Sequence, residues 1–366
     1  MALPFDPADP VGPDFRHAVE EEISAFLTEQ EPVLDTVGEE LAPVLAAARD
    51  YTAGGKRLRP AFCYWGRVAA SGQPVDPRAL VRAAASLELL HVSALVHDDL
   101  MDHSDTRRGL PSAHRRFEEA HREAGGRGDP ASFGADVALL LGDLLVMWSM
   151  EMFAGCGLEA SRLASATTLL EAVRTEVTCG QVLDVAAQAG MAGTTSESAL
   201  DLAGRVVEFK SASYTVVRPC QIGVALGNGS AQLHQTMADF GSPLGRAFQY
   251  RDDLLGVFGD AELTGKPAGD DLREGKRTVL VAHALARSTA ADAACLESLL
   301  GRPDLDDSDV ARARRIIEDS GARAAVEETI ETSYMTALAA LNGSAMTDAG
   351  RTALAELARR CVRRRT

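Results

Sequence analysis

The sequence lacks several features that would place it in a common class of protein. It has no CxxC pair among its six cysteines, only 5% aromatic residues, and a formal net charge of −16. Scattered cysteines predict reduced thiols in a cytoplasmic protein rather than a disulfide framework. The acidic balance argues against sequence-independent binding to nucleic acid, which needs a basic surface. Anionic substrates remain compatible, because local arginines or bound cations can reverse the field inside a cleft.

Long uncharged apolar runs are also missing. The longest apolar block, residues 137–150, is interrupted by Asp143 and falls short of the ~18 residues of a membrane span. The first 15 residues are rich in Pro and Asp and lack the basic-then-apolar order of a signal peptide. We therefore expect a soluble protein with no transmembrane segment, in which residues 1–14 form a flexible tail.

Strand-like alternation and internal repeats are absent as well, whereas apolar residues recur at helical spacing over most of the chain. Frequent Ala, Leu and Glu favour helix over strand. The pattern predicts an all-α protein of about ten or more helices around one large core, with residues 15–366 as a single domain. Helices are expected over 15–49, 78–102, 135–155, 158–189, 197–227 and 231–258. Residues 122–132 are expected to form a loop, and 259–276 are too rich in Gly and charge for a continuous helix.

The first candidate site is the segment HDDLMD at 97–102, which ends a strongly apolar helical stretch. Asp98 and Asp102 are four residues apart, so on a helix they share one face and can grip a hard cation. Clustered carboxylates at such a place repel one another unless a cation neutralises them. Taken alone, the segment fits a metal site and a solvated helix end equally well.

A second acidic segment, RDDLL at 251–255, repeats this logic with Asp252 and Asp253 after another apolar helix. Two such helix ends in one chain predict a shared cluster of divalent ions. Ligation by oxygen alone selects Mg²⁺ over Zn²⁺, and Mg²⁺ typically bridges carboxylates to phosphate oxygens. His91 and His97 near the first segment are interpreted as hydrogen-bonding or packing residues rather than zinc ligands.

Basic segments accompany the acidic ones: GGKRLRP at 54–60, TRRG at 106–109, and Lys266 and Lys276 after the second acidic segment. Arginine forks and a Gly-opened turn before a helix both suit phosphate oxygens. Each basic cluster alone is more often solvated surface. Interleaved with the acidic clusters and a large apolar interior, they predict a diphosphate ligand with an apolar tail.

In this order the motifs resemble those of the trans-type polyprenyl diphosphate synthases, which include the farnesyl and geranylgeranyl diphosphate synthases. The resemblance covers GGKRLRP, HDDLMD with RRG, GQ at 180–181, RDDLL with TGKP, and DDLREGKRT, from Gly54 to Thr278. It implies a helical bundle around a central cavity and a homodimer. It also implies Mg²⁺-dependent head-to-tail condensation of isopentenyl diphosphate with an allylic diphosphate (dimethylallyl, geranyl or farnesyl).

The resemblance also implies roles for individual residues. Asp98 and Asp102, supported by Asp99, would bind Mg²⁺ on the allylic diphosphate, and Asp252, assisted by Asp253, would hold a further ion, making roughly three. The isopentenyl diphosphate site would comprise Lys56, Arg59, His91 and Arg108. The allylic diphosphate would be held by Arg107, Lys210, Ser211, Gln249, Lys266 and Lys276, of which Arg107, Lys210, Gln249 and Lys266 would act in catalysis. Gln181 and Asp184 would lie near the metals.

One position departs from the family's second motif, which often reads DDxxD. Here the fifth residue is Gly256 and the next aspartate is Asp260, so metal ligation should rest on Asp252. The loop from Gly259 to Lys276 is a candidate lid that would exclude water from the reactive cation.

Product length should depend on what blocks the tunnel beneath the first motif. One helical turn spans ~5.4 Å, and the residues four and five before Asp98 are the small Ala94 and Ser93, with Leu90 a turn deeper. No aromatic plug stands there, so growth past C15 is expected, with C20 as the first choice and C25 or longer as the alternative.

Two rival functions remain. A class I terpene cyclase would share the fold and the acidic helix, but it needs no isopentenyl site such as GGKRLRP and RRG imply. A non-catalytic partner subunit of a heteromeric synthase should have lost an acidic motif, and both are present. The basic C-terminus, with Arg359, Arg360 and 363–365, could reach the diphosphate site or a membrane surface but is read as a solvated tail.

Overall fold

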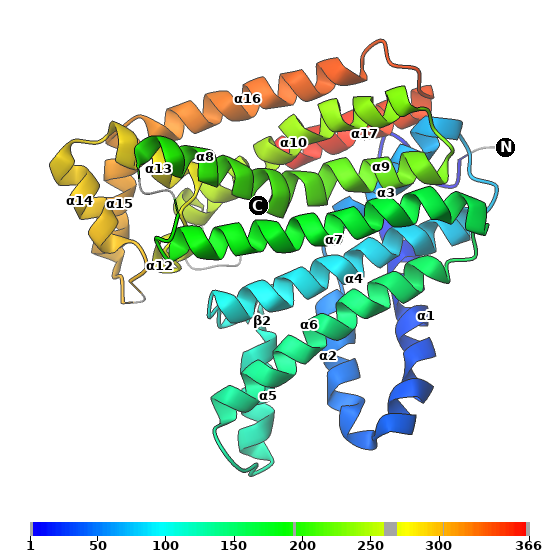
Figure 1. Ribbon diagram of the computed structural model, residues 1–366, viewed down its shortest axis with the longest axis horizontal. Helices are drawn as coiled ribbons and strands as arrows, with labels where there is room; N and C mark the ends of the chain where they lie inside the picture. Colours follow the sequence, from blue (N-terminus) through cyan, green and yellow to red (C-terminus); the bar gives the residue numbers. More distant parts are fainter. Residues whose placement is uncertain (1–2, 193–194, 260–268, 303, 364–366) are drawn as a thin grey trace.

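The computed structural model describes residues 3–192, 195–259, 269–302 and 304–363, and almost all of this chain is helical (Figure 1). The only strands within those ranges are β1 (Thr106–Arg107) and β2 (Leu110–Pro111), which form one antiparallel pair. The all-α prediction is therefore confirmed. The helices, in chain order, are α1 (Pro13–Val37), η1 (Glu39–Leu41), α2 (Ala42–Thr52), α3 (Leu58–Ser71), α4 (Pro77–Met101), α5 (Ala113–Glu123), α6 (Pro130–Ala154), α7 (Ala160–Gln188), α8 (Ser196–Val206), η2 (Val207–Val217), α9 (Arg218–Leu226), α10 (Ala231–Phe258), α12 (Asp270–Arg273), α13 (Val279–Arg287), α14 (Ala290–Leu299), α15 (Asp307–Asp319), α16 (Ala322–Leu341) and α17 (Asp348–Val362).

The core joins helices that are distant in the sequence. α4 packs against α6, α3 against α9, and α10 against both α16 and η2. α7 packs against η2 and α9, so η2 lies between α7 and α10. One cluster of buried apolar side chains extends from Val11 to Val362. Figure 1 shows the long helices α4, α6 and α7 running beside one another, while α12 to α15 gather at one end of the molecule.

Local sequence sets where the two central apolar helices begin. Asp76 caps α4 by accepting a hydrogen bond from the Ala79 backbone N–H at 3.0 Å. Asp129 caps α6 through the Ser132 N–H, also at 3.0 Å. In both cases a proline follows the cap, where its missing N–H costs nothing. These Asp-Pro pairs fix where α4 and α6 begin.

Two predicted helices differ from those in the structure. The expected helix over 15–49 breaks at Gly38, between α1 and η1. The expected helix over 197–227 continues along its whole length, but its central turns, η2, are a π-helix rather than an α-helix. Helical periodicity in the sequence cannot distinguish these two windings, because both keep the backbone helical. π-helical turns are rare and occur mostly at functional sites.

Residues 3–12 lie packed on the body of the protein, which differs from the flexible tail that the composition suggests. The Phe5 ring meets Phe15 and Tyr64 edge-on, each with centroids 5.2 Å apart. The Trp65 indole N–H donates to the Pro10 carbonyl at 2.9 Å. The Arg360 guanidinium of α17 also pairs with Asp9 at 2.8 Å, whereas Arg359 pairs with Glu356 and Arg363 lies over the Tyr334 ring of α16.

Two helices are long and apolar enough to cross a membrane by length and composition, although no uninterrupted apolar run of that length was expected. They are α4, whose most apolar window is 78% buried, and α6, whose window is 44% buried. α4 is apolar on several sides because it packs against α1, α3 and α6. α6 buries one side against α4 and α5 and leaves other apolar side chains exposed.

Candidate active site

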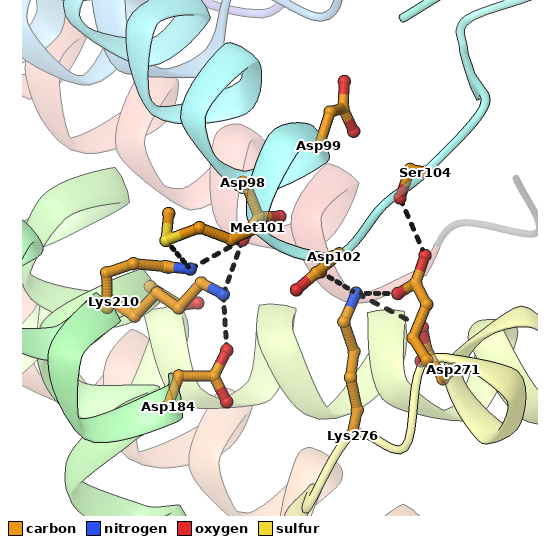
Figure 2. Close-up of polar contacts among 12 residues, drawn as sticks. Asp98, Asp99, Met101, Asp102, Ser104, Asp184, Lys210, Asp271 and Lys276 are labelled. Atoms are coloured by element: carbon orange, nitrogen blue, oxygen red, sulfur yellow. Dashed lines mark hydrogen bonds and ion pairs between the residues drawn. The ribbon is translucent and has the colours of Figure 1, made fainter. Parts of the chain in front are cut away.

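The first acidic motif lies at the C-terminal end of α4, facing lysines from two other parts of the chain (Figure 2). Lys210 of η2 donates to Asp98 Oδ1 at 2.9 Å and to Asp184 Oδ2 of α7 at 2.6 Å. Lys276, just after α12, approaches Asp102 Oδ2 at 3.3 Å. The predicted neighbours Asp98, Asp102, Lys210 and Lys276 therefore come together, although almost 180 residues separate the outermost pair.

The two carboxylates of this motif that face the lysines have pKa values shifted in opposite directions. Burial alone would raise the pKa of Asp98, but Lys210 and Lys276 hold it well below its usual range. Burial and the neighbouring Asp98 charge raise the pKa of Asp102 to about 6, although Lys276 opposes this. The pKa of Lys210 is raised because Asp98 and Asp184 outweigh the effect of its own burial. At neutral pH this part of the site thus holds alternating negative and positive groups.

Two glycines allow η2 to deliver Lys210 to this place. A β-carbon at Gly180 of α7 would lie 2.5 Å from the Lys210 backbone nitrogen. A β-carbon at Gly245 of α10 would collide with Ala212 on the other side of η2. Both residues of the Gly180-Gln181 pair contribute to the site. Gly180 lets η2 approach α7, and the Gln181 amide donates to Asp98 Oδ1 at 3.0 Å.

The second acidic motif, on α10, faces the same η2 turn. The Ser211 hydroxyl donates to Gln249 Oε1 at 2.6 Å, and the Gln249 amide donates to Asp253 Oδ1 at 2.8 Å. Arg251 turns the other way and forms a two-pronged pair with Glu327 of α16 at 2.7 and 2.8 Å. Burial, with contributions from Asp271 and Asp252, raises the pKa of Asp253 to about 8. Asp253 is therefore largely neutral at pH 7, and its buried Oδ2 has no hydrogen-bond partner among the described residues.

The position that departs from the family's second motif is filled from another element. The Asp271 carboxylate of α12 occupies the space beside Gly256, so that a β-carbon at Gly256 would collide with Asp271 Oδ2. Lys276 Nζ lies 3.7 Å from Asp271 Oδ1 and 2.5 Å from Glu274 Oε2. Asp271 and Glu274 were not singled out from the sequence beyond their place in DDLREGKRT. Their acidic clustering on a Gly-flanked turn is the signal that could have found them.

The two acidic motifs are joined by two short series of contacts. One runs from Asp98 through Lys210 and its neighbour Ser211 to Gln249 and Asp253. The other runs from Asp102 through Lys276 to Asp271, which lies against α10 at Gly256. The carboxylates of both helix ends thus face one region.

The residue between the two predicted ligands of the first motif has a different partner. Asp99 is buried and accepts hydrogen bonds from the Arg107 guanidinium, Nε lying 2.9 Å from Oδ1 and 3.1 Å from Oδ2. A further contact joins Arg107 Nη2 to Asp99 Oδ1. Asp99 therefore anchors Arg107, the last residue of strand β1.

The residues expected to bind isopentenyl diphosphate also lie together. Arg59 of α3 donates to the Thr215 hydroxyl at 2.8 Å, and its guanidinium lies 4.1 Å from the centroid of the Tyr214 ring. His91 Nδ1 lies 2.8 Å from the Tyr214 hydroxyl. The Arg108 guanidinium lies against Gly55, where a β-carbon would be 3.1 Å from Nη1, and so beside the turn that carries Lys56. Tyr214 and Thr215 were missed from the sequence, because nothing in their spacing marks them.

Electrostatics favour a neutral His91 here. Burial, together with the positive charges of Arg59 and Arg108, lowers the pKa of His91 well below its ordinary value. His97 faces elsewhere, with its ring beside Gly142 of α6 and Nε2 3.2 Å from the Leu139 carbonyl oxygen. His97 is thus a packing and hydrogen-bonding residue, as expected.

The three residues expected to control product length lie on two sides of α4. Ala94 is one turn before Asp98 and shares its face, below the acidic motif. Ser93 is buried and one turn before His97, on the side that packs against α6. Leu90 is buried a turn deeper. Lys266 and most of the expected lid lie outside the described residues.

The donor set fits Mg²⁺ only if the substrate completes it. Within the described ranges, no group of three or more His, Cys, Asp or Glu side chains is arranged to hold one ion. Asp98 and Asp102 instead offer carboxylate oxygens to separate lysines, Lys210 and Lys276. Mg²⁺ binds at phosphate sites through one or two carboxylates plus phosphate oxygens and water.

Comparison with known proteins gives a consistent result. A sequence model of the family described as Polyprenyl synthetase matches residues 42–317. A geranylfarnesyl diphosphate synthase of Aeropyrum pernix is 32% identical over 74% of this chain and 77% of its own. A geranylgeranyl diphosphate synthase of Saccharolobus solfataricus is 31% identical over 73% of this chain and 74% of its own. The crystal structure of geranylgeranyl pyrophosphate synthase from Corynebacterium glutamicum, complexed with isoprenyl diphosphate and magnesium, superposes with a TM-score of 0.91. It is 38% identical over 95% of this chain and 98% of that one.

Proposed function

This chain belongs to the polyprenyl synthetase family and is a trans-prenyltransferase, and we propose that it condenses isopentenyl diphosphate with an allylic diphosphate to make geranylgeranyl diphosphate (C20). The observation that carries the proposal is the pairing of two first-motif carboxylates with lysines from distant elements, Asp98 with Lys210 and Asp102 with Lys276. A metal–diphosphate unit needs both kinds of group around one space. The reaction site is proposed to lie there, above the apolar length of α4.

Asp98, Asp102 and Asp252 would hold roughly three Mg²⁺ ions together with diphosphate oxygens. Bound Mg²⁺ would neutralise the negative charge that develops on the leaving diphosphate. Lys210 would move from its carboxylate partners to a diphosphate oxygen, with Lys276, Arg107 and Lys266 completing the cationic side. Gln249, held by Ser211 at 2.6 Å, would orient the allylic substrate from α10. Gln181 would keep Asp98 in position from α7, where its amide already donates to that carboxylate.

The covalent step then needs no nucleophile from the protein. The allylic C–O bond breaks and its electron pair leaves with diphosphate, and the double bond of isopentenyl diphosphate attacks the allylic carbon to form the new C–C bond. A proton is lost from the adjacent carbon to the released pyrophosphate. Lys56, Arg59, His91 and Arg108 would hold the second diphosphate so that this double bond faces the allylic carbon. Water must be excluded, because it would trap the cation.

The direct test is incubation of the purified full chain with Mg²⁺, labelled isopentenyl diphosphate and, separately, dimethylallyl, geranyl or farnesyl diphosphate. We expect a C20 prenyl product after extraction and mass analysis, with none when EDTA is present. The absence of extractable product with every primer would refute the function, and a C25 or longer main product would correct the length.

A second test concerns the tunnel. Ala94→Phe places an aromatic ring below the acidic motif, and Ser93→Phe places one on the neighbouring side of α4 that packs against α6. We expect each change to shorten the main product to C15. Val75→Phe is the matched control, because Val75 is 92% exposed and precedes α4 at the end opposite the acidic motif. Unchanged products from both test variants would show that the chain grows elsewhere.

A homodimer in the cytoplasm is part of the same proposal. All six cysteines, which lie within the described residues, are free thiols. Exposed apolar side chains gather on α6 and α7, including Leu140 at 57%, Met147 at 61% and Val182 at 63% exposure, and a second copy would cover them. We expect Leu140→Glu to yield monomers in light scattering, whereas Val37→Glu, at an exposed apolar site on α1, should stay dimeric. A wild-type monomer would contradict the assembly.

A further inference from the structure

Tyr214 is buried between two of the residues proposed to bind isopentenyl diphosphate. It is 5% exposed, and its hydroxyl lies 2.8 Å from His91 Nδ1. On its face, the Arg59 guanidinium lies 4.1 Å from the ring centroid. One side chain therefore contacts Arg59 of α3 and His91 of α4 at the same time.

The π-helical winding of η2 places Tyr214 in this position. η2 is held closely between α7 and α10, because Gly180 and Gly245 allow its backbone to approach both helices. The next residue, Thr215, also faces Arg59 and accepts a hydrogen bond from its Nη2 at 2.8 Å. Arg59 is thus contacted by two successive residues of η2, one through a ring and one through a hydroxyl, which restricts its rotamers. The same winding carries Lys210 toward Asp98 on the other side of the site.

We propose that Tyr214 is a positioning residue for the isopentenyl substrate: its ring supports Arg59, and its hydroxyl donates to His91 Nδ1, so that His91 presents Nε2–H to a diphosphate oxygen. This inference rests on the proposed function, because it assigns Arg59 and His91 to that substrate. It adds two features that the motifs do not contain, namely a residue outside them and a defined tautomer of His91.

The tautomer follows from the donors and acceptors present. Diphosphate oxygens accept hydrogen bonds, so the imidazole nitrogen that meets them must carry hydrogen. A neutral imidazole has one N–H, and when Nδ1 accepts from a phenol that hydrogen must be on Nε2. Burial raises the pKa of Tyr214, which keeps the phenol protonated as the donor. Burial and the charges of Arg59 and Arg108 lower the pKa of His91, which keeps the ring neutral.

The alternative is that Tyr214 only fills space. In that case Tyr214→Phe, which keeps the ring and its contact with Arg59, would leave substrate binding unchanged. If the hydroxyl positions His91, the same change should raise the KM for isopentenyl diphosphate about tenfold, the value of one lost hydrogen bond to a substrate-binding group. The KM for the allylic substrate should stay within about twofold, because Asp98, Lys210 and Gln249 are untouched.

The decisive measurement is the protonation pattern of His91 in substrate-free protein, read by two-bond ¹H–¹⁵N correlation spectra of ¹⁵N-histidine-labelled full chain. His91→Gln identifies the His91 signals among the eight histidines. We expect the Nε2–H form in the wild type and a mixture of tautomers in Tyr214→Phe. Tyr64→Phe is the matched control: the Tyr64 hydroxyl is buried without a hydrogen-bond partner among the described residues, so neither KM nor the His91 spectrum should change.

Thr215→Val tests the second contact of Arg59 and should also raise the KM for isopentenyl diphosphate, without altering the His91 tautomer. A wild-type His91 protonated at Nδ1, or a Tyr214→Phe variant with the wild-type KM, overturns the inference. The spectrum is recorded without substrate, so it decides the tautomer independently of turnover. Failure of the wild type to make any prenyl product would instead refute the proposed function.

Discussion

The two acidic motifs contain the same Asp-Asp pair but differ in the charge that the structure gives to it. In the first motif Asp98 faces Lys210, which together with Lys276 keeps its pKa well below the usual range. In the second, Asp253 faces an amide and further carboxylates, and burial raises its pKa to about 8. The first carboxyl of one pair, Asp98, is therefore firmly ionised, whereas the second carboxyl of the other pair, Asp253, is largely neutral.

The second residues of the two pairs also differ. Asp99 accepts hydrogen bonds from Arg107, a cation that sits only eight residues away in the sequence. Asp253 accepts from Gln249, four residues before it on α10. The partner thus decides whether a buried carboxylate can stay charged, because an uncompensated charge is expensive to bury. The predictions below test this contrast.

The largest effect is expected from Asp98→Asn compared with Asp253→Asn. Loss of the ionised Asp98 carboxylate should lower kcat by roughly 10²–10³-fold, in the range of losing one preorganised electrostatic contact. Asp253→Asn should lower kcat by less than about tenfold, because the Asn amide resembles a carboxylic acid that is already neutral. Steady-state kinetics decide the matter. Asp239→Asn, which alters an exposed residue of α10, is the control. Equal losses in the two test variants would remove the contrast.

The next effect concerns the glycine in the second motif. Gly256→Ala puts a methyl group into the space of the Asp271 carboxylate, and we expect it to lower the free energy of unfolding by about 1–3 kcal/mol, as overpacking does. The double variant Gly256→Ala/Asp271→Ala should lose less free energy of unfolding than the two single variants lose together, because the methyl group then has room. Denaturant unfolding of the four proteins measures this coupling. Additive changes would show that Asp271 does not occupy that space.

A smaller effect is expected from pH in the metal-free protein. A carboxyl whose pKa is raised on folding stabilises the folded state fully below its ordinary pKa, and loses that contribution as pH rises through the folded value. Asp253 therefore destabilises the protein between pH 7 and about 8, by up to about 1.4 kcal/mol per pH unit.

The measurement is the melting temperature in EDTA from pH 7 to 8.5, where we expect a fall for the wild type. Asp253→Asn should be nearly independent of pH there, and Asp239→Asn should follow the wild type. A wild-type melting temperature that rises over this range would contradict the raised pKa of Asp253.

The smallest effect is expected at Ser211, which connects the two motifs through its neighbour Lys210 and through Gln249. Ser211→Ala removes the hydroxyl that holds Gln249 Oε1, a loss worth about 0.5–1.5 kcal/mol. We expect a few-fold rise in the KM for the allylic substrate. Ser211→Thr keeps the hydroxyl, as in the family's Lys-Thr pair, and should restore binding. An Ala variant with unchanged KM would mean that Gln249 is held by other contacts.

Much of the fold was predictable because helix formation depends on local spacing. The all-α class and α10 over 231–258 follow from apolar periodicity, and the start of α4 at residue 77 lies within one residue of the expected position. The break at Gly38 and the packing of residues 3–12 were not predictable. Both depend on which surfaces meet, such as Phe5 against Phe15 and Tyr64, and a one-dimensional pattern does not contain that information.

The sequence by itself determined which groups carry charge and where they recur: acid at two helix ends, with Lys and Arg on Gly-containing segments before, between and after them. It could do so because carboxylates four residues apart share a helical face whatever surrounds them. Only the tertiary structure decided the pairs, including Lys210 with Asp98, Asp271 beside Gly256, and Tyr214 between Arg59 and His91. These depend on close helix contacts and on a π-helical turn, since burial and the nearest charge, rather than residue type, set how each group is protonated.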